Sequence, residues 1–320
     1  MALLTFFTET IAVDPGSYAL RIAAKDGLVF NERTQISIDQ SANAVSGIGD
    51  SVSRTERDLL FEPVDFVIGD FNAFEMLLRG AIKKGLKQRS FLQRSLKIFF
   101  CIPSSATTVD MRAYRDSGEH AGAVEVYMMH QSCCAAIGLN ILFEVRDFIL
   151  IDFGGSKAEI AVFVESRPIS VGVFKTGTKK IFHMVKSYLL RQHKINVSDQ
   201  EVADIFETLG KDATHESIRV QHITLSPGEI HEVLRPYFTF VNDEIRETIE
   251  RVTNQTEVGK ALANGVYFTG GGSAIPYLRR QIELGGRIKT TVSSTPQLDC
   301  INGVAQVMAD KEKFKSYLMT

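Results

Sequence analysis

The chain has 320 residues, 44% of them hydrophobic, and a formal net charge of −2. This length supports a large core, which we expect to be divided over two domains. The balanced charge excludes a global basic field for nucleic acid, and no apolar run reaches the roughly 18 residues of a membrane span. The first seven residues, MALLTFF, lack the positive start of a signal peptide, so we predict a cytoplasmic protein without a nucleic-acid partner.

Four cysteines, Cys101, Cys133, Cys134 and Cys300, lack the CxxC spacing of metal and redox motifs. The first three lie in apolar stretches, and the adjacent Cys133 and Cys134 are poorly placed to form a disulfide with each other. We therefore expect buried thiols in a reducing compartment.

Strands and helices alternate along the first half of the chain. Apolar residues at helical spacing from Phe71 to Ile82 predict an amphipathic helix, and Thr107 with Asp110 predicts a capped helix start. The expected elements, in order, are two strands in 10–24, a strand pair in 27–39, a polar loop or small subdomain with little core in 40–60, helices from 70 and 107, buried strands in 95–103 and 124–129, and a helix from 131.

The second half opens with a hairpin, ILIDFGGSKAEIAVF, over 149–163. A helix over 179–193, a polar section over 194–226 and a long helix over 227–252 follow. Residues 265–282 then predict a strand, a triple-glycine turn and a helix. Alternation of this kind is typical of layered α/β domains.

One plan occurs in both halves: an apolar strand, Asp, any residue, Gly, a small or polar tip and a second apolar strand. The copies are IAVDPGSYALRIA and LIDFGGSKAEIAVF, which place Asp14 and Asp152 near the ends of their first strands. A single Asp-x-Gly hairpin is ordinary turn chemistry. Two copies together with a strand, three glycines and a helix need another explanation.

Phosphate binding is an explanation that all three segments share. Glycine lets the backbone direct N–H groups toward one point, and a helix that starts just after such a turn adds a positive dipole end. An Asp at each strand end can hold the waters of an octahedral Mg²⁺. We therefore predict two clamps, one from each domain, that close on a triphosphate in the intervening cleft.

These segments resemble the actin-like ATPase superfamily, and bacterial MreB-like, rod shape-determining proteins in particular. The similarity is carried by VDPGSYALRI with GLVFNER, by DFVIGDFNAFEMLLRGAIKK, by residues 101–129 with AAIG after them, and by FTGGGSAIPYL. It spans nearly the whole chain except 40–60 and 194–226. Sugar kinases and Hsp70-type chaperones share the glycine motifs, whereas 98–138 is the more MreB-specific part.

The resemblance implies duplicated actin-like (ribonuclease H-like) α/β domains around a nucleotide cleft. The first domain would cover 1–142, with a subdomain insert at about 33–62 and a C-terminal segment, 297–320, that packs back on it. The second would cover 143–296, with an insert at about 186–261.

The catalytic position departs from the family pattern. MreB-like proteins typically have two glutamates and a proline where this chain has His130, Gln131 and Ser132, and the first glutamate orients the attacking water. The resemblance therefore places His130 at the catalytic position and implies at most a slow ATPase.

The phosphate and ribose positions depart as well. Ser156 and Lys157 replace a glycine and a threonine of the second hairpin, and residues 176–178 replace a Gly-Gly-Asp. The glutamate that touches the ribose has no clear counterpart, and Glu201 is only a candidate. Lys157 has two readings: a cation that partly replaces Mg²⁺ against phosphate, or a side chain pointing to solvent.

The resemblance implies binding of ATP or ADP with Mg²⁺. Asp14 and Asp152 would act in catalysis and hold Mg²⁺ through water. The residues expected to bind the nucleotide are Asp14, Gly16, Ser17, Tyr18, Asp152, Gly154, Gly155, Ser156, Lys157, Gly177, Gly270, Gly271, Gly272 and Ser273.

A membrane contact is predicted at Phe91 and Leu92, in the loop that MreB-like proteins press into lipid. Basic residues surround this pair, which is also typical of a solvated helix end. These residues are Lys83, Lys84, Lys87, Arg89, Arg94 and Lys97.

Three functions remain open from the sequence. The first is a cytoskeletal protein that binds ATP, forms filaments or dimers at the inner membrane and works with cell-wall morphogenesis proteins. The second is a degenerate actin-like adaptor or regulator of a true MreB, with little hydrolysis. The third, a kinase for a sugar or carboxylate, would need a general base that we do not find near the second hairpin.

Overall fold

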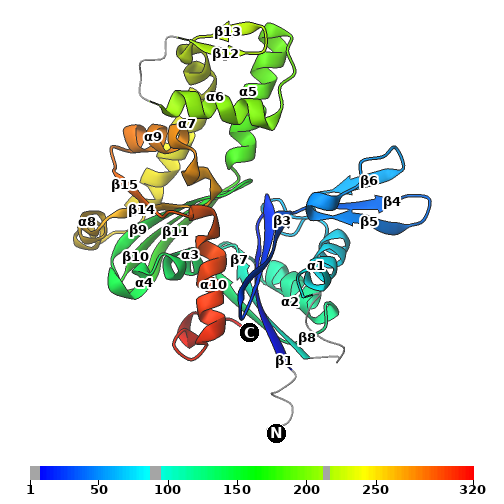
Figure 1. Ribbon diagram of the computed structural model, residues 1–320. Helices are drawn as coiled ribbons and strands as arrows, with labels where there is room; N and C mark the ends of the chain where they lie inside the picture. Colours follow the sequence, from blue (N-terminus) through cyan, green and yellow to red (C-terminus); the bar gives the residue numbers. More distant parts are fainter. Residues whose placement is uncertain (1–7, 87–94, 212–216) are drawn as a thin grey trace. The chain divides into compact units, whose positions relative to one another are not determined.

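A computed structural model describes residues 8–86, 95–211 and 217–320 (Figure 1). The chain divides into two compact units. The first comprises Met1–Leu142 and Leu298–Thr320, and the second comprises Phe143–Gln297. No helix in the described ranges is long and apolar enough to cross a bilayer.

A five-stranded sheet with the order β3-β2-β1-β7-β8 forms the centre of the first unit. β1 and β2 form an antiparallel hairpin, whereas β1, β7 and β8 run parallel. Ile11, Val13 and Ile98 are fully buried because helices α1 and α2 cover that face. The strands are β1 Thr8–Pro15, β2 Ala19–Ala24, β3 Gly27–Arg33, β7 Ser95–Ile102 and β8 Ala123–His130, and the helices are α1 Phe71–Gly85 and α2 Thr108–His120.

Helices α3 (Gln131–Gly138) and α10 (Asp299–Ala309) pack against each other, and both contact strand β7 (Figure 1). Their backbones touch at Gly138 and Gly303, where an added Cβ would overlap the carbonyl oxygens of Asp299 and Cys134 respectively. The C-terminal helix is therefore a structural part of the first unit. Beyond it, Met319 pairs with Met128 of β8 through two backbone hydrogen bonds of 2.9 Å.

Residues 36–61 form a small three-stranded sheet rather than a loop. The sheet has the order β5-β4-β6, and Ile48 and Phe61 pack against the core of the unit. The strand pair expected in 27–39 is wrong in one respect, because β3 pairs with β2 while β4 pairs with β5 and β6. The strands are β4 Ile36–Asp39, β5 Ala44–Ile48 and β6 Asp58–Phe61, and a short turn of helix, η2, covers Gly49–Ser51.

The second unit contains a sheet of the same kind, with the order β11-β10-β9-β14-β15. β9, β10 and β11 are antiparallel, whereas β9, β14 and β15 run parallel. Ile149, Ile151 and Phe153 of β9 join a core that also takes side chains from five helices within residues 178–286. The strands are β9 Phe148–Phe153, β10 Ala158–Val164, β11 Arg167–Phe174, β14 Val266–Thr269 and β15 Thr290–Val292.

The described parts of the polar section, 194–211 and 217–226, form more secondary structure than their composition suggests. They contain helix α6 and a hairpin of β12 and β13, both of which place apolar residues in the core. Ser198 with Glu201, and Ser226 with Glu229, form capping boxes that start α6 and α7. The elements are α5 Thr178–His193, α6 Asp199–Gly210, β12 Ile218–Val220, β13 Ile223–Leu225, α7 Pro227–Glu250, α8 Gln255–Asn264 and α9 Pro276–Gly286; α4 Ile141–Glu144 links the units, and short helical turns cover Gly271–Ala274 (η3), Pro296–Leu298 (η4) and Lys315–Tyr317 (η5).

The two sheets share one topology, three antiparallel strands followed by two parallel ones. The hairpin of β1 and β2 in the first unit corresponds to that of β9 and β10 in the second. The duplicated α/β architecture predicted from the two Asp-x-Gly hairpins is confirmed.

All four cysteines are buried as thiols, outside any disulfide. Burial is the main cause that raises the pKa of the Cys134 thiol to about 11. The prediction of buried thiols is confirmed.

Candidate functional site

The first predicted clamp is the turn between β1 and β2. Asp14 lies near the end of β1, and Gly16 follows it in a tight turn, where an added Cβ would stand 2.9 Å from the Ala19 carbonyl oxygen. Thr34 fixes the turn from the side: its hydroxyl donates to the Gly16 carbonyl at 2.5 Å and its N–H donates to that of Tyr18 at 3.1 Å. The turn is therefore held by a contact outside the hairpin.

Asp14 forms an ion pair that the sequence analysis missed. Asp14 and Arg21 are direct partners across the hairpin, and Arg21 Nη1 lies 3.2 Å from Asp14 Oδ2. The Arg21 side chain is only 14% exposed. The Arg21 guanidinium thus lies beside the carboxylate that was predicted to hold Mg²⁺ through water.

Tyr18 lies at the tip of the same turn and is 52% exposed. The Arg33 guanidinium carbon lies 4.5 Å from the centre of its ring, a cation–π contact. The tip therefore presents an aromatic face and a positive charge.

His130 lies at the same edge of the first sheet as this turn. It ends β8 and pairs with Ile102, two residues beyond Phe100, which itself pairs with Val13 of β1. Since neighbouring strands are about 4.8 Å apart, His130 lies roughly 10 Å from the end of β1. Its Nδ1 is 3.4 Å from the carbonyl oxygen of Pro103.

The second clamp is the turn between β9 and β10. Asp152 is buried and pairs across the strands with Glu159. Lys157 Nζ lies 2.6 Å from Glu159 Oε1, and the lysine side chain is 11% exposed. The reading of Lys157 as a solvent-exposed turn residue is therefore wrong.

Gly177 packs directly on this second turn. An added Cβ there would overlap the carbonyl oxygen of Gly155. As a result the first N–H groups of α5 reach the turn: Thr178 donates to the Gly154 carbonyl at 3.0 Å, and Lys179 to that of Gly155 at 2.8 Å. The predicted grouping of Gly177 with the hairpin glycines agrees with these contacts.

The triple-glycine turn lies against the same strand ends. Thr269 of β14 pairs with Asp152, and Gly270 follows with φ 78°, a backbone conformation that favours glycine. A Cβ at Gly270 would overlap Asp152 Oδ1. Ser273 donates to the Gly270 carbonyl through its N–H at 3.2 Å and its hydroxyl at 2.8 Å.

Each unit thus gathers its own predicted residues at one sheet edge. Asp14, the β1–β2 turn and His130 lie at the edge of the first sheet, and Asp152, the β9–β10 turn, Gly177 and the triple-glycine turn at that of the second. Glu201 is engaged elsewhere. Its Oε2 accepts hydrogen bonds from the N–H and hydroxyl of Ser198 at the start of α6, and its Oε1 accepts one from Gln221. The hydrogen bond from the Ser198 N–H is the main cause that lowers the pKa of this carboxyl.

The predicted Mg²⁺ ligands fit a hydrated metal ion poorly. Asp14 already pairs with Arg21, and Oδ1 of Asp152 packs against the backbone of Gly270. Among the described residues, no three His, Cys, Asp or Glu side chains are grouped to hold a metal ion. The Mg²⁺ site stays a prediction, and these contacts argue against it.

Comparison with known proteins decides the family. A profile of the MreB/Mbl protein family matches residues 8–316, nearly the whole chain. The chain belongs to the MreB/Mbl family. It is similar to the cell shape-determining protein Mbl of Bacillus subtilis, with 25% identity over 95% of this chain and 96% of Mbl. It is equally similar to the cell shape-determining protein MreB of Escherichia coli, with 25% identity over 92% and 91% of the two chains.

Solved structures support the actin-like fold of this MreB/Mbl chain. MreB 5 of Spiroplasma citri bound to AMPPNP superposes with a TM-score of 0.84 at 19% identity, covering 97% of this chain and 98% of the other. A MamK double helical filament gives a TM-score of 0.74 at 13% identity, over 95% and 99%. The predicted family and fold are confirmed, and the chain is a cell-shape-determining, actin-like cytoskeletal protein.

The predicted membrane contact at Phe91 and Leu92 lies outside the described residues, as do Lys87, Arg89 and Arg94. Three of the surrounding basic residues, Lys83, Lys84 and Lys97, are described, and two of them form ion pairs. Lys84 Nζ lies 2.6 Å from Glu32, and Lys97 Nζ lies 2.6 Å from Glu125. These ion pairs reduce the positive charge available for an anionic lipid surface.

Proposed function

We propose that this MreB/Mbl chain binds an adenine nucleotide on its three glycine turns and assembles into filaments with further copies of itself. Two observations on relatives support the proposal. MreB5 of Spiroplasma citri has been solved with AMPPNP and with ADP, and MamK forms a double helical filament. The chain has the same fold as these proteins over nearly its whole length.

The orientation of the turn peptides carries the proposal. In a trans peptide the C=O and the following N–H point in opposite directions. The carbonyls of Gly154 and Gly155 point to the start of α5, so the N–H groups of Gly155 and Ser156 both point away from the helix. Successive N–H groups that point the same way form an anion-binding concavity.

The other two turns repeat this arrangement. The Thr34 hydroxyl donates to the Gly16 carbonyl. Because the peptide between Gly16 and Ser17 is trans, the N–H of Ser17 points to the opposite side. The Ser273 hydroxyl donates to the Gly270 carbonyl, so the N–H of Gly271 points away from Ser273. Around Gly271 a Cβ would meet nothing within 4 Å, so backbone there is open to a ligand.

Isothermal calorimetry with ATP and with ADP tests the nucleotide proposal. Wild type is expected to bind both, and Gly177→Ala to bind at least about tenfold more weakly, because the new Cβ pushes α5 off the second turn. Gly228→Ala is the matched control, since its Cβ would meet only Ser226 Oγ at 3.8 Å. Absence of heat from wild type at millimolar nucleotide would overturn the proposal.

We also propose that the filament lies at the cytoplasmic face of the membrane, near the proteins of cell-wall synthesis. Phe91 and Leu92 would each contribute about 1.5–3 kcal/mol when buried in lipid. Contacts this weak would hold only when a polymer presents many of them. Flotation of wild type and of Phe91→Ser/Leu92→Ser on anionic liposomes tests this, and equal flotation of the two proteins would exclude a lipid contact by Phe91 and Leu92.

A further inference from the structure

The C-terminal end of helix α9 exposes an apolar side chain beside two cations. Leu284 is 64% exposed, and Arg287 and Lys289, which follow the helix, are exposed as well. The nearby Glu283 accepts hydrogen bonds from the N–H and the hydroxyl of Thr290. In the part of the chain that the structure describes, no carboxylate forms an ion pair with Arg287 or Lys289. Residues 279–289 contain four cations and a single acid, so this segment is net positive. We call Leu284, Arg287 and Lys289 the basic end of α9.

Helix α7 exposes the opposite charge beside an apolar residue. Phe240 is 45% exposed, and Glu247 and Glu250 follow it at the C-terminal end of the helix, where both are exposed. Neither glutamate has an ion-pair partner among the described residues. The helix dipole disfavours acids at this end, so the stability of α7 itself does not account for them. We call Phe240, Glu247 and Glu250 the acidic end of α7.

The acidic end stays net negative although it contains basic residues. Residues 243–251 contain four acids and two arginines, and Arg246 pairs with Asp243 at 2.7 Å. A groove lies beside this segment. It has a volume of about 490 Å³ and is lined by Arg235, Pro236, Thr239, Phe240 and Asp243.

Helices α7 and α9 lie side by side within the second unit (Figure 1). The Tyr277 hydroxyl lies 2.9 Å from His231 Nδ1 in the first half of both helices. Further along, a Cβ at Gly285 would overlap the side chain of Asn242. Residue numbers thus rise together along the two helices, so the helices are parallel, and Asn242 and Gly285 lie at one level.

The apolar residues of the two ends lie at nearly the same level. Leu284 lies one residue before the contact at Gly285, a displacement of about 1.5 Å along the helix. Phe240 lies two residues before the contact at Asn242, a displacement of about 3 Å. The cations of α9 and the glutamates of α7 both lie beyond this level, toward the C-terminal ends. The two helices therefore present an apolar residue and then charge in the same order, with opposite sign.

We propose that two copies of this chain pair through α7 and α9 about a two-fold axis parallel to these helices. Rotation about such an axis keeps every residue at its level, so α9 of each copy lies on α7 of the other. Leu284 then enters the groove beside Phe240 of the second copy, and the basic end of α9 meets the acidic end of α7. Both contacts form twice. The inference deepens the self-assembly proposed above and rests on it.

Sedimentation velocity of the purified protein without nucleotide tests the pairing by charge reversal. Wild type is expected to dimerise. Arg287→Glu/Lys289→Glu and Glu247→Arg/Glu250→Arg are each expected to raise the dissociation constant of the dimer by about tenfold or more, because like charges then meet. An equimolar mixture of the two variants is expected to dimerise within about threefold of wild type, because both contacts again join opposite charges.

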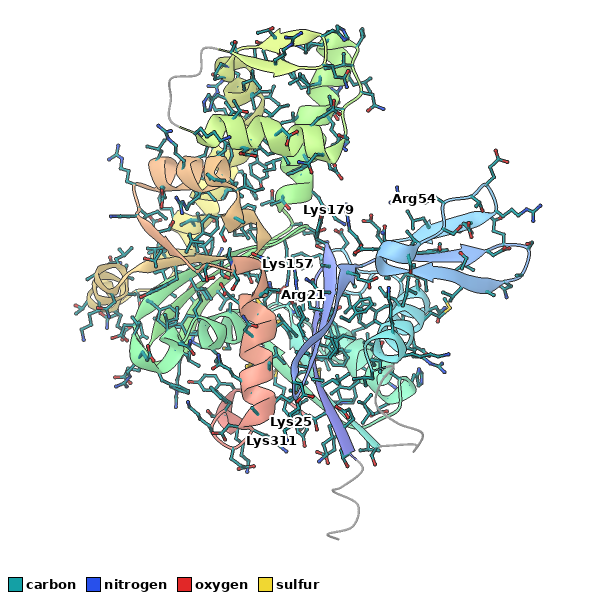
Figure 2. The ribbon with its side chains drawn as sticks, viewed as in Figure 1. Arg21, Lys25, Arg54, Lys157, Lys179 and Lys311 are labelled. Atoms are coloured by element: carbon teal, nitrogen blue, oxygen red, sulfur yellow. The ribbon has the colours of Figure 1, made fainter. Side chains whose placement is uncertain are left out.

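The control reverses two exposed lysines of the first unit. Lys25, labelled in Figure 2, lies in the turn between β2 and β3, and Lys83 lies on α1. Lys25→Glu/Lys83→Glu changes the net charge as much as the α9 variant does, and it is expected to dimerise as wild type. Leu284→Ser keeps every charge and is expected to raise the dissociation constant by about tenfold or more, so it serves if a reversal variant does not fold.

The outcomes separate this inference from the assembly on which it rests. Reversal variants that dimerise as wild type, or a mixture that stays monomeric after both have lost the dimer, would overturn the pairing. Wild type that is monomeric here but pellets as filaments with ATP would overturn the pairing and leave the proposed assembly intact. Wild type that neither dimerises nor pellets would overturn both.

Discussion

Replacing His130 by glutamate is expected to raise the rate of ATP hydrolysis by about 10²-fold or more. A correctly placed acid or base contributes roughly 10²–10⁴-fold. His130 ends β8 at the same sheet edge as the β1–β2 turn, and the resemblance to MreB-like proteins predicts that it replaces the glutamate that orients water. Release of inorganic phosphate from ATP by the purified wild type and by His130→Glu measures the effect.

The control makes the same substitution where no chemistry is expected. His222 lies exposed in the turn between β12 and β13, so His222→Glu should leave the hydrolysis rate unchanged. If wild type already hydrolyses ATP as fast as His130→Glu, the missing glutamate does not explain the activity of this chain.

Gly303→Ala is expected to destabilise the first unit by about 2 kcal/mol. The new methyl group would overlap the Cys134 carbonyl where α10 crosses α3, and the obstacle is backbone, which cannot rotate away. Overpacking typically costs about 1–3 kcal/mol, and the gain of about 1 kcal/mol in helix propensity offsets part of it. Urea unfolding followed by circular dichroism measures the change.

Gly259→Ala is the matched control for this substitution. Gly259 also lies inside a helix, α8, but a Cβ there would meet nothing within 4 Å. The variant is expected to be as stable as wild type or up to about 1 kcal/mol more stable. Equal unfolding midpoints for Gly303→Ala and wild type would show that α3 and α10 can move apart to accommodate the methyl group without loss of stability.

The alternation of elements and the repeated Asp-x-Gly hairpin were sufficient to predict the duplicated fold. A hairpin is a local structure, and its strands, turn and apolar pattern are all present in about fifteen consecutive residues. The small sheet in 36–61 was harder to predict. Its strands expose Val45, Leu59 and Leu60, so they lack the apolar pattern of a core strand.

The ion pairs of the site were missed because they depend on register. Arg21 was visible in the sequence, yet only the pairing of Asp14 with Arg21 shows that the two side chains meet. Counting outward from the innermost pair, Pro15 with Leu20, gives this pairing, but a count from Gly16–Tyr18 would have placed Leu20 opposite Asp14. The ion pair of Lys157 with Glu159 could likewise have been found from their spacing of two along one strand.

Sedimentation of the purified protein with and without ATP, combined with electron microscopy of the pellet, tests the central claim most directly. A cytoskeletal protein that assembles on its nucleotide is expected to pellet as filaments with ATP and to stay in the supernatant without nucleotide. Gly177→Ala should pellet less, and Gly228→Ala as wild type does. Wild type that binds ATP but stays in the supernatant under both conditions would contradict assembly and favour an adaptor or regulator of another MreB.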